Sequence, residues 1–595
     1  MSDSTGRIAQ VVPDLATFAV DDGFAYEIPD GLDVTVGSIV RVPLGARRVR
    51  GYVVSVRTGD TERLKPVISV SGDEPVFDEL LLRTLSWAAV HYVAPLSILL
   101  ARAAPPNLPR GATRPPASKV PGLISPLPNV SRAAAEGKHL RPTYLVAGGG
   151  YGRIVAGVAA APLAAGQNVA VVAPTVDEAA ALATELGEVY GDRVLSVSSA
   201  VAARTATKRW LAAQRGSGVL VVGTPEVALW PLGRPSLWII VEEGRRAMKA
   251  KQTPTLQVRE LVRRRSMIER SVVAFLGAVP TIDVLARGAA TVEPPGRVWP
   301  LVELVDRGED PPGAKSLAAR TAQAIRATVK RGGQVFVFVS RRGYAPAFRC
   351  VKCRELRRCP ECGSGPDRGD VCRRCGAALG PCINCGGRRF EPLGAGIGRV
   401  AEELQRLFDE TFVGPAGSGK QIIVGSERDL PYIPESALAV AVDADSLLMS
   451  PTYRAEEDAV RILARVVTTV ARGRGRRCLV QTAQPGHRAL EMLTSGHPLK
   501  YLSMLAEERE RDQLPPAAEL LAIEVSGEID ATATDLEKLE ETGIQIHGPE
   551  SGGGRTRWFL QGRSLGDVRV RLRSMVQRWR DSGVKVRVDA DPIDL

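Results

Sequence analysis

The sequence has no segment that resembles a secretion signal or a membrane span. Met1 is followed by Ser2, Asp3 and Ser4, with neither a basic patch nor an apolar run of signal-peptide length. No apolar run approaches the ~18 residues of a transmembrane helix. We therefore expect a cytoplasmic protein with no membrane partner.

Histidine is scarce, which limits the chemistry that the chain can perform. The five histidines are scattered and none pairs at a metal-ligand or catalytic spacing: His91, His139, His487, His497 and His547. The sequence therefore gives no support to a metal or acid–base site built on histidine pairs.

Acidic residues are fewer than basic ones. The chain has 78 Lys and Arg against 66 Asp and Glu, a formal net charge of +12. Such a surplus favours a polyanionic partner, of which nucleic acid is the most common, although a solvated basic surface is the alternative interpretation. Because 595 residues exceed what one hydrophobic core can serve, we expect three or more domains.

The first 142 residues divide into three kinds of segment. Residues 8–56 alternate apolar and polar positions in short runs, which is typical of a small β-barrel or sandwich. Residues 78–104 read as helical, with a predicted buried face of Leu80, Leu81, Leu85, Trp87, Ala88 and Leu96. Residues 105–142 are rich in proline and predict a linker.

From residue 143 onward the pattern predicts α/β structure. Apolar runs at Asn168–Val172 and Leu237–Val241 alternate with Ala-rich stretches, which indicates a doubly wound parallel sheet with helices on both faces. A second α/β unit starts near residue 298, with predicted strands such as Gln334–Val339 and Leu438–Val442. A final α+β segment follows at about 515–595.

Eight of the nine cysteines interrupt the second α/β unit. They form four C-x-x-C pairs: Cys350, Cys353, Cys359, Cys362, Cys372, Cys375, Cys382 and Cys385. Two residues between ligands let both thiolates face one ion, so four pairs predict two tetrahedral Cys₄ zinc sites. With no open coordination position the sites would be structural, and an iron–sulfur cluster is the main alternative. Cys478 stands alone in an apolar strand and is expected in the core.

Several strings, taken in order, resemble one bacterial family. They are FAYEIPDGL at 24–32, VRVPLGARRVRGYVV at 40–54, EPVF at 74–77, GAGIGRVAEEL at 394–404, AVDADSLL at 441–448, YRAEED at 453–458, RDQLPP at 511–516 and VRVDADPIDL at 586–595. Together with the zinc knuckles they resemble primosomal protein N-prime (PriA), the replication restart helicase. The helicase motifs are eroded, so the chain looks like a degenerate, actinobacterial-type member.

The resemblance implies a multidomain α/β fold. It places a β-rich DNA-binding domain at 1–70, a winged-helix-like helical domain at 71–104 and a linker at 105–142. Two RecA-like helicase lobes would follow at 143–296 and at 297–349 with 386–510, the second holding the zinc-knuckle insertion 350–385. A C-terminal α+β domain would occupy 511–595. The family arrangement also implies nested zinc pairing, as does the short loop 363–371. Cys350, Cys353, Cys382 and Cys385 would hold one ion, and Cys359, Cys362, Cys372 and Cys375 the other.

In the family the N-terminal domain captures the 3′ end of a nascent DNA strand. Phe24, Gly45 and Lys65 match the family positions that form this pocket, and Arg47 and Arg48 lie in an adjacent basic run. Phe24 would stack on the terminal base and Lys65 would meet a phosphate. Ala25 departs from the family, which usually has an acidic residue there, and this puts base selectivity in doubt. The alternative is that Phe24 and Tyr26 are core residues.

The family's nucleotide motifs are changed at four places. The phosphate loop should read G-x-x-x-x-G-K-T, but residues 147–154 read AGGGYGRI, so that Gly152 remains while Arg153 and Ile154 replace the lysine and the threonine. In the acidic motif Glu242 and Glu243 remain, with Val241 and Gly244 where aspartate and histidine belong. The other two changes put Thr468 and Ala471 at arginine positions, with Arg472 and Arg474 nearby, and Pro225 in GTPEV. A second loop-like string, GPAGSGK at 414–420, precedes a predicted strand instead of a helix and is not expected to bind phosphate.

These features predict a DNA-binding replication restart protein without helicase activity. It would bind forked or branched DNA, single-stranded-DNA-binding protein and other primosome or replisome proteins, hold two zinc ions and not bind ATP. The first alternative is an active ATP-dependent 3′-to-5′ helicase. The second is a zinc-ribbon nucleic-acid scaffold related only through its knuckles.

Overall fold

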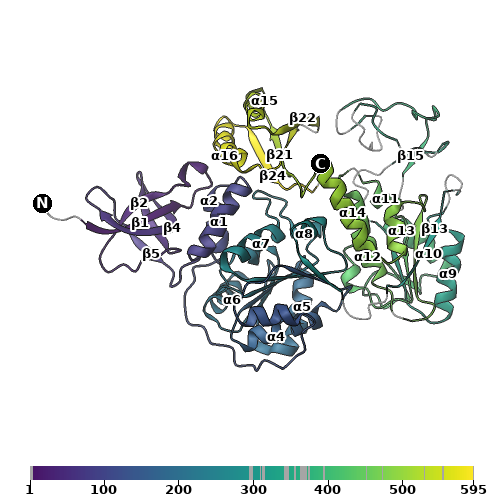
Figure 1. The fold of residues 1–595 in the computed structure, drawn as a ribbon, viewed down its shortest axis with the longest axis horizontal. Helices are drawn as coiled ribbons and strands as arrows, with labels where there is room; N and C mark the ends of the chain where they lie inside the picture. Colours follow the sequence, from purple (N-terminus) through teal and green to yellow (C-terminus); the bar gives the residue numbers. More distant parts are fainter. Residues whose placement is uncertain are drawn as a thin grey trace.

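The computed structural model describes most of the chain. The described residues are 5–293, 299–308, 310, 315–340, 348–353, 355, 357–361, 371–372, 376–392, 396–450, 452–471, 473–527, 530–552 and 555–593. Along the long axis, the N-terminal β-sheet is followed by two helices, a first α/β lobe and a second α/β lobe, with the C-terminal segment above the first lobe (Figure 1). Among the described residues, no helix is both long enough and apolar enough to span a bilayer.

The N-terminal segment forms an antiparallel five-stranded sheet in the order β2-β1-β4-β3-β5. Its strands are β1 (Thr5–Pro13), β2 (Phe24–Ile28), β3 (Ile39–Leu44), β4 (Arg47–Asp60) and β5 (Ser69–Ser71). Residues 65–68 close the sheet, because Glu27 exchanges backbone hydrogen bonds with Lys65 and Val67 while the Ile68 amide donates to the Arg41 carbonyl. The predicted small β-barrel therefore describes this segment.

Two helices, α1 (Glu79–His91) and α2 (Leu96–Ala103), follow the barrel. The Asp78 carboxylate accepts the Leu81 amide and caps α1, as expected of an aspartate at a helix start. Of the predicted buried face, Leu81, Leu85 and Ala88 are buried, whereas Leu80, Trp87 and Leu96 are only half-buried. Residues 72–142, all of which the structure describes, contain no strand. The domain predicted to be winged-helix-like therefore has its helices but no β wing.

The segment 105–142 is not only a linker, which corrects the prediction. It contains α3 (Pro128–Ala135), whose Leu127, Val130 and Ala134 belong to the core of the first lobe. The Ser131 hydroxyl donates to the Val158 carbonyl and fixes α3 to the next helix. Pro128 opens the helix, a position where proline costs little because the N–H it lacks would be unpaired anyway.

The first lobe is built on a parallel seven-stranded sheet in the order β12-β6-β11-β10-β7-β9-β8. Its strands are β6 (Thr143–Val146), β7 (Val169–Val172), β8 (Val194–Val197), β9 (Leu220–Gly223), β10 (Leu237–Val241), β11 (Val272–Gly277) and β12 (Ala290–Val292). Its helices are α4 (Tyr151–Ala164), α5 (Val176–Tyr190), α6 (Ala203–Arg215), α7 (Val258–Glu269) and α8 (Ile282–Ala286). The central strands are buried along their whole length, which explains why continuous apolar runs predicted them.

The second lobe has a parallel sheet in the order β13-β20-β19-β14-β18-β17. Its strands are β13 (Leu301–Asp306), β14 (Val335–Phe338), β17 (Val413–Gly414), β18 (Ile422–Gly425), β19 (Leu438–Ala441) and β20 (Arg477–Thr482). Its helices are α9 (Ala319–Lys330), α10 (Ile397–Phe408), α11 (Asp445–Leu448), α12 (Ala455–Val467), α13 (Arg488–Thr494) and α14 (Pro498–Arg511). Between β14 and α10, the short strands β15 (Phe348–Cys350) and β16 (Phe390–Pro392) pair at the base of the cysteine segment. Cys478 is buried in β20, as predicted.

The C-terminal segment is a four-stranded antiparallel sheet with two helices, in the order β22-β23-β21-β24. Its elements are β21 (Glu519–Ser526), α15 (Asp530–Glu537), β22 (Gln545–Gly552), β23 (Arg555–Gly562), α16 (Gly566–Asp581) and β24 (Lys585–Ala590). After β24 the chain contacts three other parts of the molecule. Asp591 pairs with His91 of α1, the Lys249 ammonium donates to the Ala590 carbonyl, and the Thr452 hydroxyl donates to the Ile593 carbonyl.

Candidate functional site

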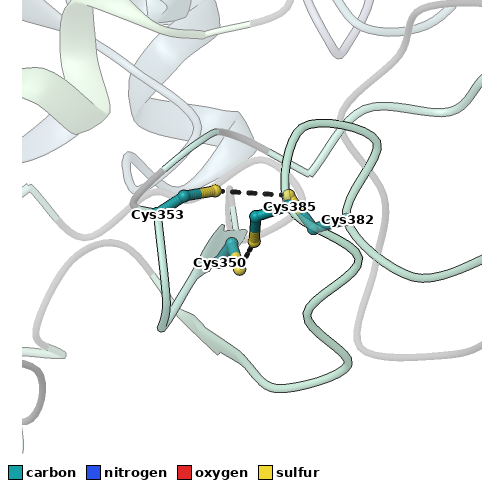
Figure 2. Close-up of side chains that lie close together, drawn as sticks. All are labelled: Cys350, Cys353, Cys382 and Cys385. Atoms are coloured by element: carbon teal, nitrogen blue, oxygen red, sulfur yellow. Dashed lines mark hydrogen bonds between the residues drawn. The ribbon is translucent and has the colours of Figure 1, made fainter.

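Four cysteines from the two ends of the cysteine segment converge on one point (Figure 2). Cys350, Cys353, Cys382 and Cys385 have sulfur atoms that all lie within 4.8 Å of one another. The Cys350–Cys385 and Cys353–Cys382 Sγ distances are 3.5 and 3.4 Å. A tetrahedral zinc with Zn–S bonds of about 2.3 Å separates its sulfurs by about 3.8 Å. This Cys₄ cluster therefore fits a zinc ion.

The backbone around the cluster has the form of zinc knuckles. The Gly386 amide donates to the Cys382 carbonyl, and the Cys382 amide donates to the Gly387 carbonyl. Gly386 has φ +67°, a conformation that suits glycine, and a Cβ at Gly387 would lie 2.9 Å from the Cys350 sulfur. The thiols differ in proton affinity: burial acts to raise the pKa of Cys350, but the backbone amides of Cys353 and Lys352 outweigh it and lower the pKa to about 7, whereas the hydrogen bond with Cys353 raises the pKa of Cys385 to about 12.

The inner cysteines are described only in part. Cys359 and Cys372 are both buried in one small apolar cluster with Leu379. Cys362 and Cys375 lie outside the described residues, so their place in a second site stays a prediction. The turn after Cys372 repeats the outer knuckle, because the Gly376 amide donates to the Cys372 carbonyl and the Cys372 amide donates to the Ala377 carbonyl.

The predicted DNA-end residues come from three segments of the barrel. Phe24 begins β2 with 40% of its side chain exposed, whereas Tyr26 is buried and donates its hydroxyl to the Pro43 carbonyl near the end of β3. The alternative that both aromatic residues are core residues therefore holds for Tyr26 but not for Phe24. Gly45 follows in the β3–β4 turn with φ +59° and open space where a Cβ would stand.

The basic residues of this region are accessible. Arg47, Arg48 and Lys65 are exposed. The Lys65 carbonyl accepts the Glu27 amide, three residues along β2 from Phe24. Hydrogen bonds thus join the end of β2 to the end of β3, just before the β3–β4 turn, and to the segment at Lys65.

The predicted phosphate loop joins β6 to α4 as a strand–loop–helix. Gly150 caps α4 with φ +65°, and a Cβ at Gly152 would lie 1.9 Å from a Glu185 carboxylate oxygen. Arg153 is exposed, and Ile154 packs against the apolar core of the first lobe. A side chain in that core has no oxygen to offer a metal ion, so this strand–loop–helix has neither a lysine at position 153 nor a hydroxyl at position 154, the groups with which phosphate loops hold a nucleotide and its Mg²⁺.

The two retained glutamates are buried beyond β10. The Tyr151 hydroxyl donates to Glu242 at 2.5 Å, and the Arg465 Nε lies 3.5 Å from the same carboxylate oxygen. Glu243 accepts the Thr281 amide at 2.8 Å and the Thr281 hydroxyl at 3.1 Å. Burial raises the pKa of Glu243, while the charges of Arg259 and Arg461 oppose the rise. Both carboxylates are therefore engaged by protein groups.

The remaining motif positions lie at the edge of the same region. Thr468, just after α12, packs so closely on Gly148 that a Cβ there would be 2.3 Å from the threonine Cβ. Pro225 lines a cavity of about 300 Å³ with Thr175 and Lys249. The Ala471 amide donates to the Ser436 carbonyl, and Arg472 lies outside the described residues. The GPAGSGK string leads directly into β18, as predicted from sequence.

The sequence reasoning missed the partners of these glutamates. Three residues of α12, Glu457, Arg461 and Arg465, recur at intervals of four and so share one helix face that is buried. This repeat of charged residues, next to an apolar repeat on the same helix, was the sequence signal that could have indicated a buried charged face. Nothing in the spacing indicated that this face would meet the first lobe.

Comparison with known proteins identifies the N-terminal part and then most of the chain. Residues 10–105 match the family described as the 3′ DNA-binding domain (3′BD) of PriA. The chain is 27% identical over 565 residues to the probable replication restart protein PriA of Mycobacterium bovis, covering 85% of each chain. It is 24% identical over 640 residues to replication restart protein PriA of Treponema pallidum, covering 95% of this chain and 96% of the relative.

Among solved structures, the structure of RecG bound to a three-way DNA junction matches with a TM-score of 0.38 and 14% identity, covering 78% of this chain and 56% of that one. The 3′ DNA-binding domain match and the near full-length alignments agree with one another. The chain is similar along most of its length to PriA replication restart proteins, and residues 10–105 match their 3′ DNA-binding domain.

Proposed function

We propose that this protein recognises stalled or branched replication forks by binding the 3′ end of a DNA strand in its N-terminal barrel. The observation that carries the proposal is the match of residues 10–105 to the 3′ DNA-binding domain. It is supported by the exposed Phe24, the open turn at Gly45 and the accessible basic residues Arg47, Arg48 and Lys65. An exposed aromatic ring offers a stacking face, and the basic side chains offer contacts to phosphates.

The test compares two forks that differ only at the leading-strand end. A fork with a free 3′ hydroxyl should bind more tightly than the same fork with a 3′ phosphate, and both should bind more tightly than plain duplex. Equal affinity for the two forks would contradict recognition of the 3′ end while leaving general DNA binding intact.

We further propose that the protein does not couple ATP hydrolysis to unwinding. Support comes from the phosphate loop, where Arg153 is exposed and Ile154 faces apolar residues. Losing the lysine, the hydroxyl that ligates Mg²⁺ and the aspartate of the acidic motif removes the groups that neutralise charge on the transferring phosphate. Arginine fingers alone contribute about 10³–10⁵ in rate, so no single retained group compensates for their loss.

The experiment is a phosphate-release assay with forked DNA present. We expect release no faster than the background without enzyme. The informative control is Glu243→Gln: DNA-stimulated hydrolysis that this variant abolishes would favour the alternative, an active 3′-to-5′ helicase.

We propose two structural zinc ions in nested sites, the outer one on Cys350, Cys353, Cys382 and Cys385. The inner site would use Cys359, Cys362, Cys372 and Cys375, supported by the repeated knuckle hydrogen bonds at Cys372. Metal analysis of the intact protein should give two zinc ions and no iron, and Cys359→Ala should lose one of them. One zinc in the wild-type protein, or visible-light absorption from an iron–sulfur cluster, would contradict the proposal.

We also propose domain boundaries, a location in the cell and protein partners for this chain. The domains would be the barrel at 1–70, the helical domain at 71–104, the two lobes, the cysteine insertion at 350–385 and the C-terminal domain from 511. In the cytoplasm, the lobes would serve as a platform for single-stranded-DNA-binding protein and other primosome proteins. Co-purification of these proteins with the intact chain on forked DNA tests this part.

A further inference from the structure

The space between the two lobes is the region where the phosphate loop, the acidic motif and α12 meet. On the first-lobe side stand Gly148 of the loop, Glu242 and Glu243 after β10, and Asp283 in α8. On the second-lobe side stand the buried charged face of α12 and the residues that flank it. In Figure 1, α8 of the first lobe lies close to α12 and α14 of the second.

Charged side chains join the lobes at several points. Arg454 donates to Asp283 at 2.7 and 3.2 Å, and the Ile282 amide donates to the Glu457 carboxylate at 2.9 Å. Arg461 donates to the Gly244 carbonyl at 3.0 Å, and Arg465 pairs with Glu242. We call these groups, with Glu243, the interlobe network; its members are Glu242, Glu243, Gly244, Ile282, Asp283, Arg454, Glu457, Arg461 and Arg465.

The network is buried, and its charged groups pair with one another and with neighbouring charges outside the network, which are Arg259, Glu427, Asp458 and Arg509. The side chains of Arg454, Arg461 and Arg465 are only 7–8% exposed. Burial acts to raise the pKa of Asp283, but the guanidinium charges of Arg259 and Arg454 outweigh it and hold the pKa well below its usual range. The Arg465 guanidinium pairs with Glu242 of the first lobe and with Glu427 of the second, and Arg461 pairs with Asp458 of its own helix, so both charges already have protein partners.

Apolar packing and close approach seal the same surface. Ala278, Val279 and Ile282 of the first lobe are buried in the apolar core of the second lobe. A Cβ at Gly244 would lie 2.1 Å from the Arg461 guanidinium, and a Cβ at Gly148 would lie 2.3 Å from Cβ of Thr468. The lobes touch so closely that glycine is the residue that fits at both positions.

We propose that the interlobe network stands in place of a nucleotide and holds the two lobes closed without any ligand. In a nucleotide-driven motor, phosphate charges attract basic groups of both lobes and closure depends on the bound nucleotide. Here the carboxylates of Glu242 and Glu243 supply the negative charge, and the arginines of α12 are already neutralised. This inference goes beyond the proposed function, because a protein that failed to bind 3′ ends could still have permanently closed lobes.

The test uses the Ile282 amide as a reporter of closure. Its hydrogen bond to Glu457 crosses between the lobes, so opening them exposes it to exchange with solvent. Hydrogen exchange of the peptide that covers 281–283 is measured in the intact zinc-loaded protein, alone and with millimolar Mg-ATP or Mg-ADP. We expect slow exchange in all three conditions. Faster exchange without nucleotide, slowed when either nucleotide is added, would overturn the proposal.

The matched variants use an added methyl group that clashes between the two lobes, which we call the wedge. In Gly148→Ala the three atoms nearest to the new methyl group all belong to Thr468 of the second lobe, and Gly148 is not in the left-handed region, so the variant carries no backbone strain. We expect exchange of the 281–283 peptide to rise about tenfold or more. The second-lobe change Thr468→Gly should restore slow exchange in the double variant, because it removes the three atoms nearest to the methyl group.

Gly187→Ala is the control, since α5 leaves open space at that position and exchange should stay at the wild-type rate. Unchanged exchange in Gly148→Ala would mean that the lobes do not stay in contact, and failure of Thr468→Gly to rescue would mean that the wedge acts elsewhere. Either result overturns the proposal. Fork binding and phosphate release, measured on the same samples, show separately whether the proposed function holds.

Discussion

The N-terminal barrel and the interlobe region use arginine in opposite ways. Arg47 and Arg48 of the barrel are exposed, and neither forms a salt bridge with another residue in the described part of the chain. Arg454, Arg461 and Arg465 of the interlobe network are almost fully buried and paired with carboxylates or a carbonyl. The comparison separates arginines that are available to a ligand from arginines already committed to the fold.

Solvation explains the difference in what substitutions should do. An exposed guanidinium stays hydrated until a phosphate replaces its water, so its removal changes binding and leaves the fold alone. A buried guanidinium has already lost its water, and its removal leaves a buried carboxylate without compensation. Substitutions in the barrel should therefore change DNA affinity, and substitutions in the network should change stability.

The largest effect is expected from Arg454→Met. The change leaves Asp283 with Arg259 and leaves Glu457 with Arg509, so both carboxylates keep one partner and lose another. We expect the free energy of unfolding to fall by about 3 kcal/mol, the lower end for breaking a buried pair. Urea unfolding followed by fluorescence measures this loss, and affinity for forked DNA should not change below the unfolding transition.

Arg320→Met provides the control for that loss. Arg320 pairs with Glu303 on the surface of the second lobe with 62% of its side chain exposed, and Glu303 keeps Arg477 as a second partner. We expect a change of about 0–1 kcal/mol. If both variants lost the same stability, the contrast between buried and exposed arginines would fail.

The next effect in size concerns Phe24→Ala. Removing the ring should lower the preference for a free 3′ end by about 1–3 kcal/mol, which is the contribution of one base stacked on an aromatic ring. Binding to a blocked fork should fall less, and the unfolding midpoint should stay in place because the side chain is 40% exposed. Fluorescence anisotropy with the two forks measures the difference.

Leu15→Ala is a suitable control for Phe24→Ala, since Leu15 is an apolar residue of the same domain with a similar exposure of 39%. Its carbonyl accepts the Ser97 hydroxyl of α2, a contact that the substitution leaves in place. It should leave the 3′-end preference unchanged. Equal losses on the free and the blocked fork for Phe24→Ala would show that the ring does not contact the strand end.

A smaller effect is expected from pH, through Asp458 beside Arg461. Burial raises the pKa of Asp458 to about 6, with the Arg461 charge opposing the rise. Since the folded-state pKa lies above the unfolded value, the folded protein takes up a proton more readily, and this carboxyl adds stability as pH falls from 7 to 5. The expected gain is about 1 kcal/mol.

Unfolding of wild-type protein and Asp458→Asn at both pH values isolates this contribution. The variant should lack about 1 kcal/mol of the change seen in the wild type, because an amide does not titrate. The depressed pKa of Asp283 makes little opposing change in this window, since its contribution to stability is lost only as pH falls through the unfolded pKa of about 3.9. A pH response that is the same in both proteins would contradict the assignment.

The smallest expected effect is a change in salt dependence. If Arg47 contacts one phosphate, Arg47→Ala should reduce the slope of log K against log salt concentration by about 0.7–0.9. The reason is that one fewer counterion is released on binding. Fork affinity measured at a series of salt concentrations gives the slope, and Arg320→Met should leave it unchanged.

The parallel strands could be predicted because strands buried on both faces appear in the sequence as continuous apolar runs. The run at Leu237–Val241 became β10 and that at Leu438–Val442 became β19, since a parallel strand covered on both faces must be apolar throughout. The helix α3 was not predicted, because Pro128 at its first turn resembles the prolines of the surrounding irregular chain. Proline marks a helix start as well as a break, and short patterns do not separate the two.

The candidate sites were predictable to different degrees for similar reasons. The outer Cys₄ cluster followed from spacing and nesting, since two-residue gaps force paired thiolates to face one point. The interlobe network did not follow, because Arg454 and Asp283 are distant in sequence and meet only when the lobes pack together. Long-range ion pairs carry no local periodicity, so sequence alone gave the carboxylates Glu242 and Glu243 but not the arginines that they face.

Gly244 has an evolutionary consequence. The family resemblance places histidine at this position, yet a Cβ here would lie 2.1 Å from the Arg461 guanidinium and 2.3 Å from Thr281. A larger side chain at Gly244 would thus require both Arg461 and Thr281 to move, and Gly148 with Thr468 sets a similar condition on the loop after β6. The close packing of the lobes therefore restricts the single substitutions that these two positions can accept.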